Sequence, residues 1–381
     1  MVSSFLKGIS ILGSTGSVGT QTLDVVKTHS DKFEIIGLSA NENHIELSKQ
    51  IEEHNPKYIS YSGTSDTIEK ICVTKQVSRK SLSEISSSNE TDLLVVATTG
   101  SVALKPTFKA ISLGKDIAIA NKEIIIMAGK KLISHAQNNN VTLMPVDSEP
   151  SAIWQCLAGE AHSSINKVII TASGGAFRDI PIERLKDVSA KESLNHPTWN
   201  MGAKITVDSA TMMNKAFEVI EAKWLFDIDW NDIEVILHPE SIIHSFVEFL
   251  DGSTKAQISP PDMRLPIQYA LFHPKRMKND NIKKFDPSKS KNITFKELDR
   301  NRYPCFEMAL SYAKKGGTWP SVLCGADESA VEAFLSGKIG FMEISELIKD
   351  SINSHKSIES PNIEDLLESY VWGQQQVKNT L

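Results

Sequence analysis

The stretch GISILGSTGSVG, residues 8–19, decides the class of fold. An apolar run typical of a buried strand is followed at once by a glycine-rich turn and by a segment with helical spacing. Similar apolar runs recur up to residue 146, namely FEIIGLSA (33–40), DLLVVAT (92–98), DIAIA (116–120) and VTLMPV (141–146). Strands that are apolar on both faces and alternate with helices predict an α/β domain with a parallel, doubly wound, Rossmann-like sheet.

The glycine-rich turn, Gly13 to Gly19, is typical of a dinucleotide site. Amides at the start of a helix can hold a pyrophosphate, and Gly16 and Gly19 would let the phosphate approach and the helix pack closely. The spacing is G-x-x-G-x-x-G, looser than G-x-G-x-x-G, so a plain tight turn is the alternative. The second strand ends at residues 38–41 without an acidic residue, which favours NADP over NAD, although Glu42 beside it weakens that preference.

The pattern changes after residue 150. The segments KVIITAS, AKITVDS (203–209), EVILH and KAQIS are predicted as strands among helices, and FEMALSYAKK, ESAVEAFLSG and ISELIKDSINSH as later helices. Residues 276–300 are rich in Lys, Asn and Asp, which indicates a linker. The predicted domains are therefore a Rossmann-like domain (1–147), a central α+β catalytic domain (148–275), the linker (276–300) and a C-terminal helical bundle (301–381).

Composition excludes several classes of function. A formal net charge of -6 gives no support to binding of nucleic acid, which favours a basic face. The four cysteines form no C-x-x-C pair, which indicates reduced thiols and neither a disulfide framework nor a zinc site. No apolar run reaches the ~18 residues of a membrane span, and the first strand begins too early for a signal peptide. We therefore expect a cytoplasmic enzyme with no nucleic-acid or membrane partner.

An acidic pair, Asp147 and Glu149, directly follows an apolar strand. In an extended segment the two carboxylates would lie on one side, with Ser148 opposite. Parallel sheets bind ligands at the carboxyl ends of their strands, and two hard oxygen donors suit Mg²⁺ or Mn²⁺. The alternative is a solvated acidic turn, and the metal site needs a third ligand.

Between His196 and Glu218 the chain reads HPTWNMGAKITVDSATMMNKAFE. Residues 203–209 are predicted as a strand that runs into a helix with Ser209 as its N-cap. The polar stripe of that helix consists of Thr211, Asn214, Lys215 and Glu218. A phosphate near the first turn could contact Ser209, Asn214 and Lys215, and Glu218 could reach a metal. An ordinary surface helix with a Lys/Glu stripe is the alternative.

Two loops are further candidates. The turn Thr171–Gly175 could bind an oxyanion through its amides, or be only a turn. The loop from His196 to Gly202 combines a polar donor with large apolar groups, as in a lid that closes on a ligand. Trp199 could equally be a core residue.

Seven motifs together closely resemble the 1-deoxy-D-xylulose 5-phosphate reductoisomerase family. They are LGSTGSVG, ANKE at 120–123, VDSEPSAIWQC, SGGAFRD, NHPTWNMG, ITVDSATMMNKAFEVIEA and HPESIIHS. The resemblance covers nearly the whole chain. It implies conversion of 1-deoxy-D-xylulose 5-phosphate and NADPH to 2-C-methyl-D-erythritol 4-phosphate, a rearrangement followed by hydride transfer in the non-mevalonate isoprenoid pathway.

The resemblance also implies roles for individual residues. The metal, Mg²⁺ or Mn²⁺, would be bound by Asp147, Glu149 and Glu218; the substrate phosphate by Ser173, Ser209, Asn214 and Lys215; and the substrate hydroxyls by Lys122 and Ser148. His196 would lie near the substrate in a flap over 196–204 that includes Trp199 and Met201. NADPH would contact Thr15, Gly16, Ser17, Val18, Asn43, Asn121, Glu123 and Gly202. The catalytic groups would be Lys122, Asp147, Glu149, His196 and Glu218, in a homodimer.

Two rival functions remain open at this point. A metal-independent semialdehyde or sugar-acid dehydrogenase would need a reactive cysteine or a base at the nicotinamide. A non-catalytic nucleotide sensor of the same fold would have no need for metal, phosphate and flap residues together.

Overall fold

The computed structural model describes residues 6–289 and 292–381, and contacts divide the chain into two compact units. Unit 1 runs up to Asn121 and adds Lys130–Asp147 and Asp262–Ile282. Unit 2 consists of Lys122–Gly129, Ser148–Pro261 and Lys283–Leu381. The three-domain division expected from the sequence stays a prediction about folding domains.

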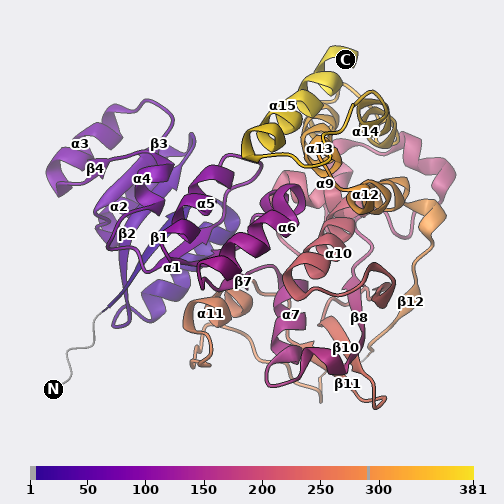
Figure 1. The fold of residues 1–381 in the computed structure, drawn as a ribbon, viewed down its shortest axis with the longest axis horizontal. Helices are drawn as coiled ribbons and strands as arrows, with labels where there is room; N and C mark the ends of the chain where they lie inside the picture. The colour runs from indigo at the N-terminus through magenta and orange to yellow at the C-terminus, as the bar shows by residue number, and fades with distance from the viewer. Residues whose placement is uncertain (1–5, 290–291) are drawn as a thin grey trace. The chain divides into compact units, whose positions relative to one another are not determined.

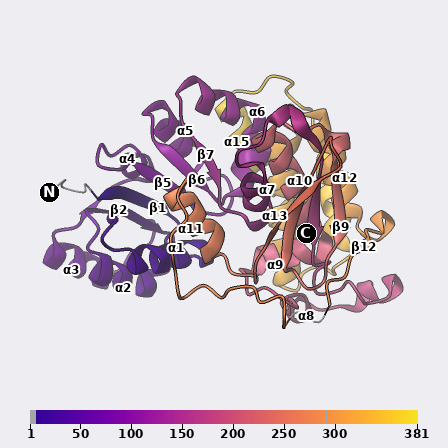
Figure 2. The same ribbon diagram turned by 90° about the horizontal axis from the view of Figure 1, so that it is seen from below.

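Unit 1 is built on a seven-stranded parallel sheet with the order β4-β3-β2-β1-β5-β6-β7. Its strands are β1 (Lys7–Leu12), β2 (Phe33–Ala40), β3 (Tyr58–Tyr61), β4 (Ser78–Arg79), β5 (Leu93–Val96), β6 (Asp116–Ile119) and β7 (Leu143–Pro145). Its helices are α1 (Ser17–Thr28), α2 (His44–His54), α3 (Asp66–Lys75), α4 (Leu82–Ser86), α5 (Leu104–Ser112) and α11 (Arg264–Phe272), and α6 (Lys122–Asn138) belongs partly to each unit. Figure 2 shows α1 and α2 on one face of this sheet and α4 and α5 on the other.

The core of unit 1 lies on both faces of the central strands. Ile9, Ile11 and Leu12 of β1 are fully buried, and so is the whole of β5. Because helices cover both faces, these strands carry apolar residues without alternation. The strands predicted at 8–13, 33–40, 92–98, 116–120 and 141–146 all contain observed strands.

The glycine-rich turn connects β1 to α1 as expected. Gly13 has a φ of +85°, and a Cβ atom on Gly19 would lie 2.3 Å from the Gly13 carbonyl oxygen, so helix and turn pack closely only with glycine. The Gly13 amide donates a hydrogen bond to Ser39 Oγ at 2.8 Å. Helix α1 starts after Gly16 with neither a side-chain cap nor an acidic residue in its first turn. Its first amides are therefore available to an anion.

Unit 2 contains a mixed five-stranded sheet with the order β11-β10-β8-β9-β12. The strands are β8 (Ile165–Ala172), β9 (Ile233–Leu237), β10 (Ile243–Phe249), β11 (Thr254–Ile258) and β12 (Lys296–Glu297). The helices are α7 (Ser148–Leu157), α8 (Ala190–Ser193), α9 (Ala203–Thr211), α10 (Met213–Phe226), α12 (Pro304–Lys315), α13 (Trp319–Leu335), α14 (Glu343–Asn353) and α15 (Ile363–Thr380). Short 3₁₀ helices lie at His162–Ser164, Ile182–Asp187, Trp230–Asp232 and Arg300–Arg302. Figure 1 shows α12 to α15 gathered around α13, the C-terminal helical region.

The strand predicted at 203–209 is wrong, because this segment forms helix α9. Its β-branched residues suggested a strand, but Thr206, Val207, Ala210 and Thr211 are buried on a helical face. The Thr206 hydroxyl donates to the Gly202 carbonyl at 2.8 Å. Tertiary burial has overridden the local β propensity.

The N-cap role predicted for Ser209 is also wrong. Ser209 lies near the end of α9, and Met212 adopts a left-handed conformation (φ +62°) between α9 and α10. The boundary between α9 and α10 therefore lies at Met212, three residues after the predicted N-cap. Ser209 nevertheless remains close to the first turn of α10.

The segment predicted as a linker is partly structured. Lys296 and Glu297 form β12, which pairs antiparallel with Leu237 and Ile236 of β9. The preceding residues up to Ile282 group with unit 1 by contacts. Strand β10 was not predicted, and its segment IHSFVEF lacks the strict polar–apolar alternation that indicates a strand.

Among the helices of the described residues, none combines the length and the apolar character needed to cross a membrane.

Gly129 gives a first testable prediction. It kinks α6, and a Cβ atom there would lie 2.5 Å from the Trp224 indole nitrogen. We expect Gly129→Ala to lower the free energy of unfolding by about 1–3 kcal/mol, as overpacking commonly does. Urea denaturation measures this, with Gly340→Ala as the control, because its Cβ would meet only the tip of Glu343 at 3.2 Å. Equal midpoints for the wild type and Gly129→Ala would mean that Trp224 moves aside without cost.

Candidate active site

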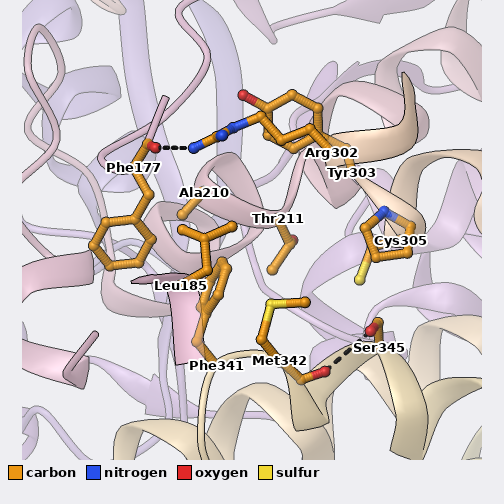
Figure 3. Close-up of a pocket in the computed structure, with 11 residues that line it drawn as sticks. Phe177, Leu185, Ala210, Thr211, Arg302, Tyr303, Cys305, Phe341, Met342 and Ser345 are labelled. Atoms are coloured by element: carbon orange, nitrogen blue, oxygen red, sulfur yellow. Dashed lines mark hydrogen bonds between the residues drawn. The ribbon is translucent and has the colours of Figure 1, made fainter. Parts of the chain in front are cut away.

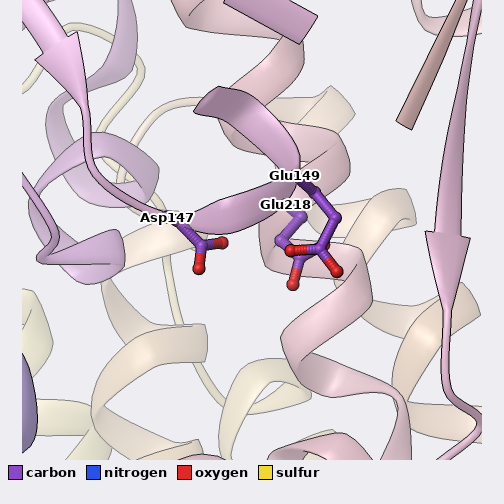
Figure 4. Close-up of side chains that lie close together, drawn as sticks. All are labelled: Asp147, Glu149 and Glu218. Atoms are coloured by element: carbon purple, nitrogen blue, oxygen red, sulfur yellow. The ribbon is translucent and has the colours of Figure 1, made fainter. Parts of the chain in front are cut away.

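Three carboxylates lie close together near the connection between β7 and α7. Asp147 follows β7, Glu149 lies in the first turn of α7, and Glu218 lies on α10. Each offers one oxygen, and these oxygens all lie within 4.8 Å of one another (Figure 4). Glu149 is helical, so the expected extended segment with Asp147 and Glu149 on one side is wrong. The helix start instead turns Glu149 toward α10.

The donor set of this carboxylate cluster (Asp147, Glu149, Glu218) fits a hard divalent cation. It contains oxygen ligands only, with no thiol or imidazole, which suits Mg²⁺ or Mn²⁺ better than zinc. Glu218 is almost fully buried at 1% exposure. A buried carboxylate needs a compensating cation or hydrogen bonds, so the cluster is more than a solvated acidic turn.

Lysine and asparagine side chains bind the same carboxylates. Lys215 Nζ lies 2.8 Å from Glu149 Oε1 and also donates to Glu218 Oε2. The Asn214 amide donates to Glu218 Oε1 at 2.6 Å. Asn214, Lys215 and Glu218 therefore form one connected polar group on α10 with Glu149 of α7.

Lys122, at the start of α6, adds a second cation. Its ammonium lies 2.9 Å from Glu221 and 3.8 Å from Glu218. Lys122 is buried. Its two carboxylate partners, Glu218 and Glu221, lie three residues apart on α10. This arrangement holds its ammonium beside the carboxylate cluster.

Electrostatics keep Glu149 and Lys215 charged at neutral pH. Burial raises the pKa of Glu149, but the nearby Lys215 and His244 outweigh it and lower that pKa to about 2. Burial lowers the pKa of Lys215, and the attraction of Glu149 and Glu218 more than offsets it, so the net shift is upward. Glu149 is thus an ionised carboxylate and Lys215 a charged ammonium.

Two serine hydroxyls converge on the imidazole of His196. His196 Nε2 lies 2.9 Å from Ser173 Oγ and 3.2 Å from Ser209 Oγ. His196 Nδ1 accepts hydrogen bonds from the backbone amides of Thr198 and Trp199, at 3.2 and 2.9 Å. Because Nδ1 accepts, the neutral ring carries its proton on Nε2 and donates from there. The structure therefore brings together Ser173, His196 and Ser209, which lie far apart in the sequence.

His196 supplies a pH-dependent prediction. Burial, Arg178 and Lys215 lower its pKa to about 4, against the opposing effect of Glu149. A histidine whose pKa is lower in the folded state than its unfolded value of about 6.5 stabilises the fold above that value. This contribution is lost as the pH falls from about 6.5 to 4. We expect the wild type to lose more unfolding free energy than His196→Gln over this range in chemical denaturation, and parallel pH profiles would contradict the assignment.

The predicted flap residues lie in a loop that ends at Gly202, the N-cap of α9. Trp199 is half-buried, with its ring centroid 5.9 Å from that of His244. Thr198 Oγ1 lies 3.1 Å from Ser241 Oγ. Met201 is half-buried as well. The loop is thus fastened at both ends, by His196 and by α9.

The expected cofactor residues are divided between the two units. In unit 1, Gly16 and Ser17 are exposed at the start of α1, flanked by Thr15 and Val18, and Asn43 caps α2 by accepting from the Glu46 amide at 3.1 Å. The buried Asn121 donates to the carbonyls of Thr98 and Gly100, at 2.8 and 2.9 Å. Glu123 and Gly202 belong to unit 2. The structure places these residues, and their roles remain expectations.

Comparison with known proteins identifies the family. Three family models match, for 1-deoxy-D-xylulose 5-phosphate reductoisomerase at residues 9–129, its C-terminal domain at 143–226 and the DXP reductoisomerase C-terminal domain at 258–376. A curated relative of the same name from Thermoanaerobacter pseudethanolicus is 48% identical over 367 residues, which cover 95% of this chain and 96% of its own. The chain belongs to the 1-deoxy-D-xylulose 5-phosphate reductoisomerase family. The resemblance of the seven motifs is thereby confirmed.

Solved structures of the reductoisomerase family share the whole architecture. The enzyme from Zymomonas mobilis in complex with NADPH superposes with a TM-score of 0.91 at 35% identity, over 99% of both chains. A second reductoisomerase, in complex with NADPH, fosmidomycin and magnesium, gives a TM-score of 0.89 at 34% identity, over 98% of both chains. The predicted fold class, a Rossmann-like domain with a central α+β region and a C-terminal helical region, is confirmed.

Sequence reasoning missed several residues around this reductoisomerase site. Glu221 pairs with Lys122, His244 contacts Trp199, and the Ser245 hydroxyl donates to the Glu149 carbonyl at 3.2 Å. Glu221 could have been found three residues after Glu218, on the same side of α10. Lys204 was missed because 203–209 was predicted as a strand. Lys204 and Asp208 are i,i+4 neighbours only in a helix.

The cysteines do not provide the nucleophile that the dehydrogenase rival requires. All four are buried. Burial raises the pKa of each thiol, to about 11 for Cys156 and further for Cys305 and Cys324. A nucleophilic cysteine needs a lowered pKa and access to solvent, so these thiols are inert.

A separate cavity in unit 2 is unsuited to the substrate. It lies against the end of α9, and Phe177, Leu185 and Phe341 form much of its apolar lining (Figure 3). Its interior of about 20 Å³ has room for roughly one water molecule. No lining residue carries a carboxylate or an imidazole. The cavity therefore offers neither space nor acid–base chemistry for a sugar phosphate.

Proposed function

We propose that this chain is the metal-dependent reductoisomerase of its family, converting 1-deoxy-D-xylulose 5-phosphate and NADPH to 2-C-methyl-D-erythritol 4-phosphate and NADP⁺. The observation that carries the proposal is the position of Lys215. Its ammonium contacts Glu149 and Glu218 of the carboxylate cluster and lies close enough to His196 to lower its pKa. One substrate with a metal-binding end and a phosphate end matches this arrangement.

Asp147, Glu149 and Glu218 would hold Mg²⁺ or Mn²⁺, which supplies Lewis-acid stabilisation of negative charge on substrate oxygens. Lys122 and Ser148 flank the cluster and would contact the substrate hydroxyls. Ser148 Oγ donates to Glu149 Oε2 at 2.5 Å, so its hydroxyl is directed into the site. Lys122, fixed by Glu221, places a positive charge where the substrate carries its oxygens. These residues orient the reacting end.

The phosphate would be bound by Ser173, Ser209, Asn214 and Lys215, a mixed set of hydroxyl, amide and ammonium donors. The neutral His196 directs its Nε2 proton at the same two serines and so keeps them in place. Binding energy from a phosphate remote from the bond changes positions the reacting carbons. Trp199 and Met201 in the flap would exclude water from this end.

NADPH, which supplies the hydride, would lie with its pyrophosphate at Thr15, Gly16, Ser17 and Val18. The uncapped start of α1 supports this, since amides and the helix dipole favour an anion. Asn43, Asn121, Glu123 and Gly202 would contact other parts of the cofactor. We expect NADPH to be preferred over NADH, and steady-state kinetics with both cofactors tests the effect of Glu42; equal kcat/KM values would contradict the preference.

The central experiment is NADPH oxidation by the purified protein on addition of 1-deoxy-D-xylulose 5-phosphate. We expect turnover with Mg²⁺ or Mn²⁺ and its loss with EDTA. Lack of turnover with both metals would overturn the proposal. Turnover that survives EDTA would favour the metal-independent dehydrogenase.

We also propose that the chain acts as a cytoplasmic homodimer. Strand β11 is at the edge of the five-stranded sheet. Its last residue, Ile258, is 42% exposed, and Leu250, which precedes the strand, is 69% exposed. An edge strand with apolar side chains is suited to pairing with a second copy. Light scattering should give twice the chain mass, and Ile258→Lys should shift it toward the monomer; a monomeric wild type would contradict the dimer.

A further inference from the structure

Lys204, in the first turn of α9, is the centre of a buried charge cluster in unit 2. Its ammonium lies 2.6 Å from Asp208, 2.7 Å from Asp327 of α13 and 3.5 Å from Glu123 of α6. Asp208 and Asp327 are 2% and 0% exposed. The same ammonium lies 5.1 Å from the centroid of the Phe217 ring on α10. One side chain therefore contacts four helices.

Carboxyl groups outnumber cations in this cluster. Three carboxylates surround one ammonium, and Oδ1 of both Asp208 and Asp327 is buried without a hydrogen-bond partner among the described residues. Burial and their mutual repulsion raise the pKa of Asp208, and burial raises that of Asp327. Lys204 also occupies the end of α9 where the helix dipole disfavours a cation. Both the burial of these carboxyl groups and the position of the cation at a helix N-terminus lower stability. Apolar side chains would stabilise a core at this place more simply.

The helices that Lys204 joins carry residues of the proposed site. Gly202, the N-cap of α9, ends the flap two residues before Lys204. Asp208 immediately precedes Ser209, and Glu123 immediately follows Lys122. Asp327 lies in the middle of α13, which is buried along most of its length. The cluster thus connects the flap end, a phosphate serine and the start of α6 to a rigid helix.

We propose that Lys204 is a positioning residue for the reductoisomerase reaction, which fixes Gly202, Ser209 and Glu123 relative to α13. The inference rests on the proposed function, because it takes Gly202 and Glu123 as cofactor contacts and Ser209 as a phosphate contact. Lys204 makes its contacts with side chains of α6, α9, α10 and α13. Lys204 acts by holding α9 and the start of α6 in fixed positions relative to each other. Gly202, where the flap ends, then stays in place when the flap closes.

The test compares Lys204→Met with Lys204→Arg. We expect Lys204→Met to weaken NADPH binding about tenfold in fluorescence titration and to lower kcat by about 10–100-fold, as small misplacements of reacting groups do. Lys204→Arg keeps the charge and should recover most of both. Lys223→Met is the matched control, because Lys223 forms a similar i,i+4 pair with the exposed Asp227 and should leave kinetics unchanged. Wild-type values for Lys204→Met would overturn the proposal.

A double variant tests whether Lys204 positions the site or only compensates the charge of the buried carboxylates. In Lys204→Met/Asp327→Asn one uncompensated carboxylate is removed, so the thermal midpoint should rise above that of Lys204→Met. If Lys204 positions the site, NADPH affinity and kcat stay low in this double variant. Recovery of function together with stability would overturn the proposal.

Hydrogen exchange supplies a measurement that does not depend on turnover. Amides in 196–211 should exchange faster in Lys204→Met than in the wild type, while those of β8 remain protected. Unchanged exchange in 196–211 would overturn the proposal. Failure of the proposed function would instead appear as an inactive wild type whose α9 amides still respond to Lys204→Met.

Discussion

Replacing Glu218 by Gln should lower metal-supported turnover by at least about 100-fold while NADPH still binds. Gln keeps the size of the side chain and can still accept from Asn214, but it removes the negative charge of one of the three side chains in the carboxylate cluster. A hard divalent cation depends on that charge. Metal titration by calorimetry and NADPH titration by fluorescence separate the two effects.

Glu234→Gln is the control for this variant. Glu234 is an exposed residue of β9 that pairs with Lys167, and it does not belong to the carboxylate cluster. It should bind metal and turn over like the wild type. Normal turnover in Glu218→Gln would remove Glu218 from the metal site, and loss of NADPH binding together with turnover would point to misfolding.

Replacing Lys215 by Met should have the largest effect on stability as well as on substrate binding. Without the ammonium, the half-buried Glu149 carboxylate and the buried Glu218 carboxylate lose the cation that pairs with both of them. Loss of one partner from a buried ion pair commonly costs about 3–5 kcal/mol. The proposed phosphate contact is lost at the same time, so the KM for the sugar phosphate should rise steeply.

Metal provides the decisive comparison for Lys215→Met. A divalent cation between Glu149 and Glu218 would replace the missing positive charge, so Mg²⁺ should raise the thermal midpoint of Lys215→Met more than that of the wild type. Lys223→Met, whose partner is exposed, should respond to Mg²⁺ as the wild type does. Equal Mg²⁺ effects on Lys215→Met and the wild type would mean that the cation does not bind between these carboxylates.

The sequence predicted five of the seven strands of unit 1, because each of those five is a short apolar run bounded by turn residues. Strands β3 and β4 at the edge of the sheet were not predicted. The glycine-rich turn was equally readable, since Gly13 and Gly19 occupy positions that only glycine fits. Prediction failed at 203–209, where isoleucine, threonine and valine suggested a strand. Helix α9 forms there because its buried face and the Lys204–Asp208 pair outweigh local propensity.

The site was only partly readable for a related reason. The pattern of Asp147, Glu149 and Glu218 suggested metal ligands, but nothing local says that α7 and α10 bring Glu149 and Glu218 together. Likewise, Ser173 and Ser209 belong to separate motifs in the sequence. Only the structure shows that both hydroxyls contact His196. Their convergence depends on how β8, the flap loop and α9 pack.

By itself, the sequence determined the alternation of strands and helices in unit 1, the dinucleotide turn and the types of residue that the chemistry requires. These are local properties, fixed by periodicity, glycine geometry and side-chain donors. Only the tertiary structure decided that 203–209 is helical, that Lys215 lies between two carboxylates and that Lys204 joins four helices. Those outcomes depend on burial and on charges brought together from distant segments, which no local pattern encodes.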